Sequence, residues 1–210
     1  MISFPIITGI FGIIIAIVTS IISRKEKPPL WATIFTLSLS IGIIICSYFE
    51  AVKQSNAEKD ILYSITGGDS FCYIQFQNIK SGNGKLLVIH NGNYPIYDVE
   101  ARIVDLDKYN QAASQNEKIK ELLGLNYQIG NLIPGFARDL VQWKETIPGQ
   151  LRLNIFFIAR NGSYTQCYRR QLVDGEIAFA NKVEYNGKIV LEEISKNFPK
   201  NEKGEIDWEE

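Results

Sequence analysis

Histidine is nearly absent from this sequence, which has only His90 among its 210 residues. The three cysteines, Cys46, Cys72 and Cys167, do not have the spacing of metal ligands. A zinc site needs three or four ligands, and a histidine-dependent active site needs partner residues that no motif supplies. We therefore expect no catalytic residue, no metal and no cofactor, and we predict that the protein is not an enzyme.

An excess of positive charge is also missing. The chain has 22 lysines and arginines against 23 aspartates and glutamates, for a formal net charge of −1. Binding to a nucleic-acid polymer or to anionic lipid usually depends on a basic patch or segment. We expect no nucleic-acid partner.

Two long runs contain no charged residue at all, Ile2–Ile22 and Leu30–Phe49. Each run has about 20 residues, or roughly 30 Å of helix, which matches the hydrocarbon thickness of a bilayer. The connection of residues 23–29 is short, so the runs predict an antiparallel hairpin of two transmembrane helices (about 2–22 and 30–49) within residues 1–49. Small residues four apart favour close helix packing, either within this hairpin or between copies of the chain: Gly12, Ala16 and Ser20 in the first run, and Ser38, Gly42 and Cys46 in the second.

The first run differs from a cleaved signal peptide, which begins with basic residues and has a shorter apolar core. Arg24, Lys25 and Lys27 lie in the hairpin loop, whereas Lys53 and Lys59 lie on the other side. The positive-inside rule favours a cytoplasmic loop. We expect an integral protein of the inner or plasma membrane, with the rest of the chain outside the cytoplasm.

The remainder is predicted to be a β-domain carried on a stalk. Residues 50–66 continue the second helix, and Gly67-Gly68-Asp69-Ser70 ends it. Residues 67–196 show period-two apolar alternation with turns between short segments, and residues 197–210 form a polar, acidic tail that we expect to be loosely held. A short helix is expected at 117–123, and strands are expected at 71–77, 85–90, 97–103, 127–133, 140–147, 151–159, 163–172, 176–185 and 188–194.

The segment KLLVIHNGNYPIYDVEARIVD (Lys85–Asp105), followed by Leu132-Ile133-Pro134-Gly135 and the apolar strand Gly149–Ala159, resembles immunoglobulin-like domains of the CARDB kind from bacterial surface proteins. The resemblance covers residues 71–163 and departs from the pattern at 108–123 and after Asn161. It implies an immunoglobulin-like β-sandwich. The whole chain is similar to uncharacterised bacterial proteins with a membrane hairpin and one β-domain.

Few residues suggest chemistry. His90 ends a strand and is interpreted as structural. Asp105, Asp107 and Asn110 offer oxygen ligands but lack the glycine and late glutamate of a calcium loop. The Gly67–Ser70 segment opens no helix and has no lysine, so it is interpreted as a turn and not as a phosphate cradle.

The most suggestive residues lie on the strand expected at 163–172. Tyr164, Tyr168 and Arg170 share one face of this strand, and Arg169 points to the other face. Tyrosine and arginine side chains can hold an anion or stack on a base. These three residues are the candidate ligand or partner surface.

The sequence therefore predicts a membrane-anchored, all-β binding or interaction module, whose partner is another protein or a second copy joined through the helices. The alternative is an effector with two transmembrane helices, in which the β-domain senses a nucleotide and the helices then assemble in the membrane. A sensor needs a pocket with basic and aromatic groups inside a closed barrel. An interaction module needs an open pair of sheets with an exposed face.

Overall fold

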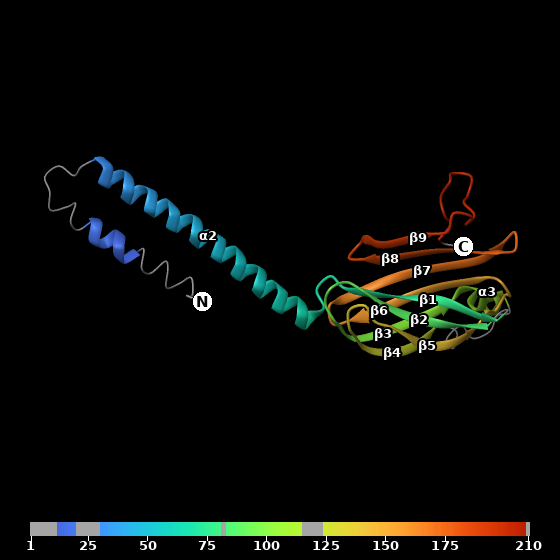
Figure 1. Ribbon diagram of the computed structural model, residues 1–210. Helices are drawn as coiled ribbons and strands as arrows, with labels where there is room; N and C mark the ends of the chain where they lie inside the picture. The colour runs from blue at the N-terminus through green and yellow to red at the C-terminus, as the bar shows by residue number, and fades with distance from the viewer. Residues whose placement is uncertain (1–11, 20–29, 81–82, 115–123, 209–210) are drawn as a thin grey trace. The chain divides into compact units, whose positions relative to one another are not determined.

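The computed structural model describes residues 12–19, 30–80, 83–114 and 124–208. The chain divides into two compact units, Met1–Ile61 and Leu62–Glu210. The described part of the first unit is helical, and every strand of the described chain lies in the second (Figure 1). The predicted β-rich domain is confirmed.

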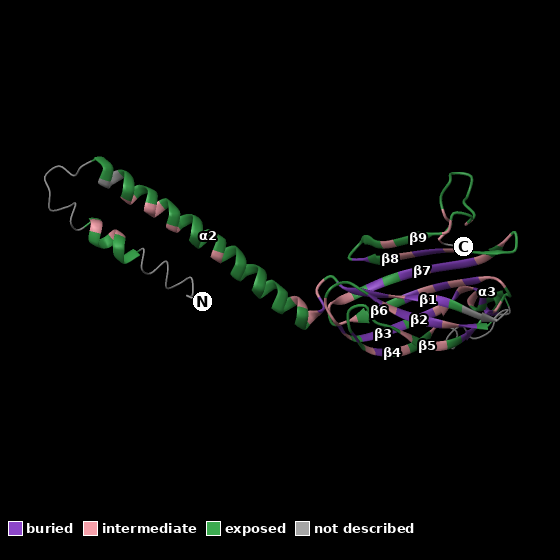
Figure 2. Cartoon of the chain, in the orientation of Figure 1, coloured by how far each residue is buried: buried purple, intermediate pink, exposed green. Residues whose placement is uncertain are grey.

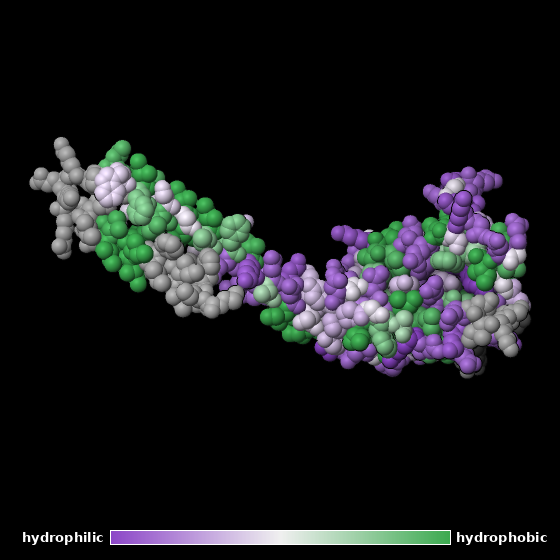
Figure 3. Space-filling model, in the orientation of Figure 1, coloured by the Kyte–Doolittle hydropathy of each residue, from purple (hydrophilic) through white to green (hydrophobic). Residues whose placement is uncertain are grey.

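One uninterrupted helix, α2, runs from Leu30 to Thr66. The second apolar run and the expected stalk of residues 50–66 therefore belong to the same helix. Most of its side chains are exposed (Figure 2), and apolar side chains gather chiefly on its N-terminal half (Figure 3). Within the described chain, α2 is the one helix long and apolar enough to span a membrane.

The first expected membrane helix is described only in part. Residues 12–19 are helical. The rest of that run and the connecting segment lie outside the described residues, so the hairpin stays a prediction.

The second unit contains two antiparallel sheets (Figure 1). The three-stranded sheet has the order β1–β2–β5, with bounds Phe71–Lys80, Asn83–Asn91 and Ala137–Lys144. The six-stranded sheet has the order β4–β3–β6–β7–β8–β9, with bounds Leu125–Leu132, Ile96–Asp105, Leu151–Ala159, Gly162–Val173, Glu176–Tyr185 and Lys188–Ile194. Period-two alternation of buried and more exposed residues, which places one face of a strand inward, is clear in β2, β3 and β6, whereas the edge strand β9 has no buried residue.

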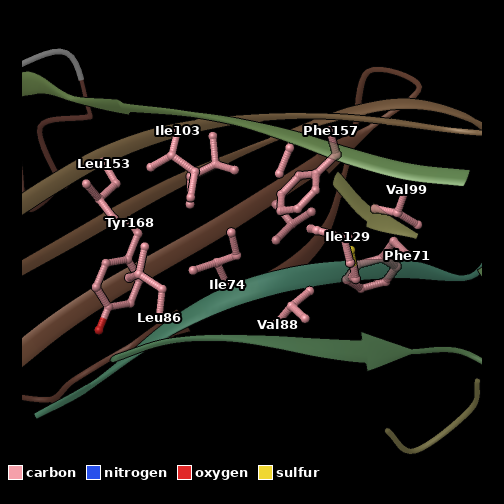
Figure 4. Close-up of a cluster of buried hydrophobic side chains, with 14 of the residues drawn as sticks. Phe71, Ile74, Leu86, Val88, Val99, Ile103, Ile129, Leu153, Phe157 and Tyr168 are labelled. Atoms are coloured by element: carbon pink, nitrogen blue, oxygen red, sulfur yellow. The ribbon is translucent and has the colours of Figure 1, made fainter. Parts of the chain in front are cut away.

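The inward faces of the two sheets share one hydrophobic core (Figure 4). Ile74, Leu86 and Val88 of the smaller sheet lie against Leu153 and Phe157 of the larger one, and all five are nearly inaccessible to solvent. Burying a side chain of this size contributes about 1.5–3 kcal/mol. This shared core fixes which face of each strand remains available to a ligand or partner.

The end of α2 belongs to the β-domain. Gly67 has a φ of 101° and its backbone N–H donates to the Tyr63 carbonyl at 2.8 Å, which closes the last helical turn. The Tyr97 hydroxyl donates to the Ser64 carbonyl at 2.9 Å. Asn161 Nδ2 donates to the Ser70 carbonyl at 2.6 Å. The Gly67–Ser70 segment is thus the helix-to-strand turn that the sequence predicts.

A helix that the sequence analysis missed, α3 (Leu106–Ser114), follows β3. Asp105 Oδ1 accepts hydrogen bonds from the backbone N–H groups of Asp107 at 3.0 Å and Lys108 at 3.2 Å, so Asp105 caps the helix. The helix expected at 117–123 lies outside the described residues.

Most of the C-terminal residues 197–208 are exposed, but the end of the segment contacts the sheet through Trp208, and the loosely held tail stays a prediction. The Trp208 carbonyl accepts a hydrogen bond from Arg169 Nη2. The Lys182 ammonium lies 4.7 Å from the centre of the Trp208 ring. Both partners are on the outward face of β7 and β8.

Candidate functional site

The candidate surface on β7 is buried. Tyr164, Tyr168 and Arg170 share one face, as predicted, but they are only 2%, 3% and 5% exposed. Their face is the inward one, between the two sheets. These three residues therefore do not form an exposed ligand or partner surface. Alternation identifies residues that share a face, but it does not say which face of a strand rich in tyrosine and arginine is buried.

Two side chains on the inward face of β7, Tyr164 and Gln166, complete the edge of the smaller sheet. Strand β1 pairs only with β2, so its other edge has free backbone groups. The Cys72 N–H donates to the Tyr164 hydroxyl at 3.0 Å, and the Ile74 N–H donates to Gln166 Oε1 at 2.8 Å. Gln166 Nε2 donates to the Ile74 carbonyl at 2.6 Å. Side chains of β7 thus replace the strand that β1 lacks on this edge.

A buried ion pair lies on the same inward face. Arg170 Nη1 pairs with Glu145 Oε1, and the two side chains are 5% and 1% exposed. Glu145 Oε2 accepts the Gly149 N–H at 2.8 Å. The Arg170 guanidinium lies 4.9 Å from the centre of the Phe76 ring. The ion pair and the contact with Phe76 argue for a structural role of Arg170.

The two cysteines of the β-domain are free and lie on opposite faces of the sheets. Cys72 is buried on the inward face, whereas Cys167 lies on the outward face of β7 and is half-buried. Burial raises the pKa of the Cys72 thiol to about 12, and its hydrogen bond with Tyr164 opposes this only in part. A protonated thiol is a poor nucleophile. Cys72 lies directly opposite His90 in the β1–β2 ladder, but the pair is not a nucleophile with its base.

His90 has a structural position. It is 5% exposed, and its Nε2–H donates to the Tyr94 carbonyl at 2.8 Å. Nδ1 is buried and has no hydrogen-bond partner within the described chain. Burial lowers the pKa of His90, so the ring is neutral near pH 7.

We expect His90→Gln to lower the free energy of unfolding by about 0.5–3 kcal/mol, the range of an ordinary substitution. Because the pKa of His90 is lower in the folded protein, the unfolded chain takes up a proton first as the pH falls below about 6.5. His90 therefore lowers the free energy of unfolding of the wild type in that acid range, and the Gln variant has no such loss at this position. Urea unfolding of both proteins at pH 5 and pH 7.5 measures this pH dependence. A difference between the proteins that does not change with pH contradicts the assignment.

The acidic residues considered for calcium have other partners. Asp105 caps α3 and also accepts the Thr146 hydroxyl at 3.1 Å. Asp107 pairs with Arg152 at 2.7 Å and accepts Gln150 Nε2 at 3.1 Å. No group of three or more histidine, cysteine, aspartate or glutamate side chains suited to a metal occurs within the described residues.

An open hollow lies on the outward face of the six-stranded sheet, over β4, β3 and β6, and has a volume of about 790 Å³. Phe156 and Ile158 of β6 are 45% and 62% exposed within it. Polar side chains surround them, and Gln128 Nε2 donates to Glu100 Oε1 at 2.6 Å at the rim. The remaining lining residues include Arg102, Asn126 and Asn154. We call this feature the outer-face hollow.

The sequence carried a signal for this hollow. Residues 155–158 of β6 read Ile-Phe-Phe-Ile, so β6 is apolar on both faces, whereas its neighbour β3 alternates apolar and polar residues. A strand with one solvated face normally alternates. Strand β6 departs from this rule, because Phe156 and Ile158 are apolar residues on its outward face, where polar residues are expected.

Comparison with known protein families, with curated proteins and with solved structures gives no match for this chain. Its function is therefore inferred from its own geometry.

Proposed function

We propose that this chain is a non-catalytic, membrane-anchored interaction module, whose β-domain is an immunoglobulin-like sandwich that binds a protein partner in the outer-face hollow. The anchor is the expected helical hairpin, of which α2 is the second helix. Its uncharged run is long enough to cross a bilayer, and α2 continues into the β-domain as one helix. In the proposed orientation the β-domain is outside the cytoplasm.

The order of the strands supports an immunoglobulin-like sandwich. In that fold strands A, B and E pair in one sheet, strands C, F and G pair in the other, and C′ joins the edge of C. Taking β1–β7 as A, B, C, C′, E, F and G gives the two observed orders, β1–β2–β5 and β4–β3–β6–β7. The hairpin β8–β9 then extends the second sheet.

The observation that carries the proposed function is the exposure of Phe156 and Ile158 in the hollow. Large apolar side chains clustered on a polar face, with hydrogen-bonding groups at the rim, are typical of protein interaction sites. Aromatic residues are also enriched at the centres of such sites. Glu100, Arg102 and three amide side chains supply the polar rim.

The alternative, a nucleotide-sensing effector, needs a pocket inside a closed barrel. The β-domain has two separate sheets of three and six strands. The outer-face hollow lies on an outward face, as an interaction module requires. These features favour the binding module.

A photoreactive phenylalanine analogue placed at position 156 tests the proposed function in intact cells. We expect illumination to give a discrete cross-linked product that is lost when Ile158→Ser is added. The matched control places the same analogue at Ile133, which is 59% exposed and directly follows β4. Equal cross-linking at both positions, or none at 156, contradicts a partner in the outer-face hollow.

A further inference from the structure

A second pocket lies between the outward face of β6 and β7 and the C-terminal segment, with a volume of about 340 Å³. Arg152 and Arg169 line it from the sheet, and Phe198, Lys200 and Asp207 line it from the C-terminal segment. Pockets that hold small ligands begin at about 300 Å³. We call it the arginine pocket.

The two arginines are directly opposite each other in the β6–β7 ladder. Like charges in this arrangement repel, so the pair destabilises the sheet unless negative charge lies nearby. Asp107 provides some of it, because its Oδ1 is 2.7 Å from Arg152 Nε. The Arg152 side chain remains 23% exposed, and Lys200 and Arg170 also line the pocket, although Arg170 pairs with Glu145.

Arg169 is 3% exposed, but within the described chain its guanidinium forms no ion pair. Nη1 donates to the Leu153 carbonyl at 2.9 Å, and Nη2 donates to Asn154 Oδ1 at 3.0 Å and to the Trp208 carbonyl. Nε is buried and has no hydrogen-bond partner among the described residues. Burial lowers the pKa of Arg169 overall, although Asp107 and Asp207 are near enough to oppose this in part. A further negative group in the adjoining pocket would offset the remaining cost of burying this charge.

We propose that the arginine pocket binds a phosphate group, held by Arg152 and Lys200 and attracted by the buried charge of Arg169. The planar guanidinium matches the geometry of phosphate oxygens, and an ammonium adds a compact charge. Asp207 also lines the pocket, and its carboxylate offsets part of the positive charge there. The phosphate belongs either to a soluble compound or to a lipid headgroup. This site is separate from the outer-face hollow, so the two proposals fail or succeed independently.

Binding is measured on the full chain in two settings. In neutral detergent the probe is inorganic pyrophosphate, titrated by calorimetry at low and high salt. In nanodiscs the thermal unfolding midpoint is compared between phosphatidylcholine alone and phosphatidylcholine with phosphatidic acid. Binding of pyrophosphate in detergent indicates that the phosphate belongs to a soluble compound. A rise of the unfolding midpoint with phosphatidic acid, without binding in detergent, indicates a lipid headgroup.

Lys200→Gln is the first variant, because Lys200 is exposed and its loss does not threaten folding. We expect it to weaken binding about ten- to a hundredfold, the effect of one charged hydrogen bond. Arg152→Gln should do the same, although it also leaves Asp107 without its ion pair. Lys203→Gln and Arg138→Gln remove the same charges outside the pocket and should leave affinity unchanged. The proposal is overturned if neither setting shows saturable binding, or if Lys200→Gln and Lys203→Gln weaken binding equally.

Discussion

Replacing Arg170 with methionine is expected to lower the free energy of unfolding by about 3–5 kcal/mol. The substitution keeps an apolar stem against Phe76 but leaves the Glu145 carboxylate buried, with a side chain only 1% exposed. An unpaired carboxylate in that position must either remain charged without compensation or take up a proton. Urea unfolding of the full chain in detergent, followed by tryptophan fluorescence, gives the change.

Two further variants separate this effect from a general loss of charge. Glu145→Gln combined with Arg170→Met removes both charges and should be more stable than Arg170→Met alone. Lys85→Met breaks the exposed ion pair with Asp139, whose side chains are 34% and 56% exposed, and should change stability by only about 0–1 kcal/mol. If Arg170→Met and Lys85→Met have the same effect, the buried pair does not have the role assigned to it.

Gln166→Leu is expected to be similarly severe, at about 3 kcal/mol or more. Gln166 bonds both backbone groups of Ile74, and its Nε2 also donates to Asn181 Oδ1 at 2.7 Å. Leucine fills the space but leaves three buried polar groups without partners, each at a cost of about 1–3 kcal/mol. We expect the edge of β1 to loosen first, so amide hydrogen exchange at Ile74 should rise more than at Val88 in the core.

Gln128→Leu is the matched control, because Gln128 also lies on a strand of the larger sheet and bonds one exposed carboxylate, that of Glu100. Its free energy of unfolding should change by about 0.5 kcal/mol or less. Equal destabilisation by the two leucine variants argues against Gln166 as the group that completes the β1 edge.

The strand pattern was largely predictable from the sequence, because period-two alternation and turn residues act locally. Val99, Ala101 and Ile103 alternate with charged residues and are all buried on β3. The Asn161-Gly162 turn joins β6 to β7, which pair from Ala159 and Gly162 onward. Helix α3 was missed, although Asp105 before an apolar residue is a recognisable cap.

The role of β7 was not predictable in the same way. Tyr164, Gln166, Tyr168 and Arg170 form a polar stripe that normally indicates a solvated or ligand-binding face. They are buried because β1 ends the smaller sheet directly above them, and its free backbone groups need partners. That requirement depends on the pairing of the strands across the two sheets, which a local pattern does not contain.

The arginine pocket has a comparable origin. Arg152 and Arg169 are distant in sequence, and only the register of the β6–β7 hairpin places them opposite each other. The other wall comes from Phe198 and Lys200, in a segment that the sequence suggested would be loose. Its position depends on contacts of Trp208 with Arg169 and Lys182, which alternation and composition do not indicate.

Extraction of isolated cell membranes with alkaline carbonate tests the central claim, membrane anchoring, most directly. The full chain should stay in the membrane pellet, because the proposed hairpin would place the uncharged run in α2 and the first apolar run within the hydrocarbon. Detergent should release it. Two aspartates introduced at Ile41 and Ile45, in the middle of the apolar part of α2, provide a variant that should be retained less well. Release of the unaltered chain by carbonate alone would contradict the account.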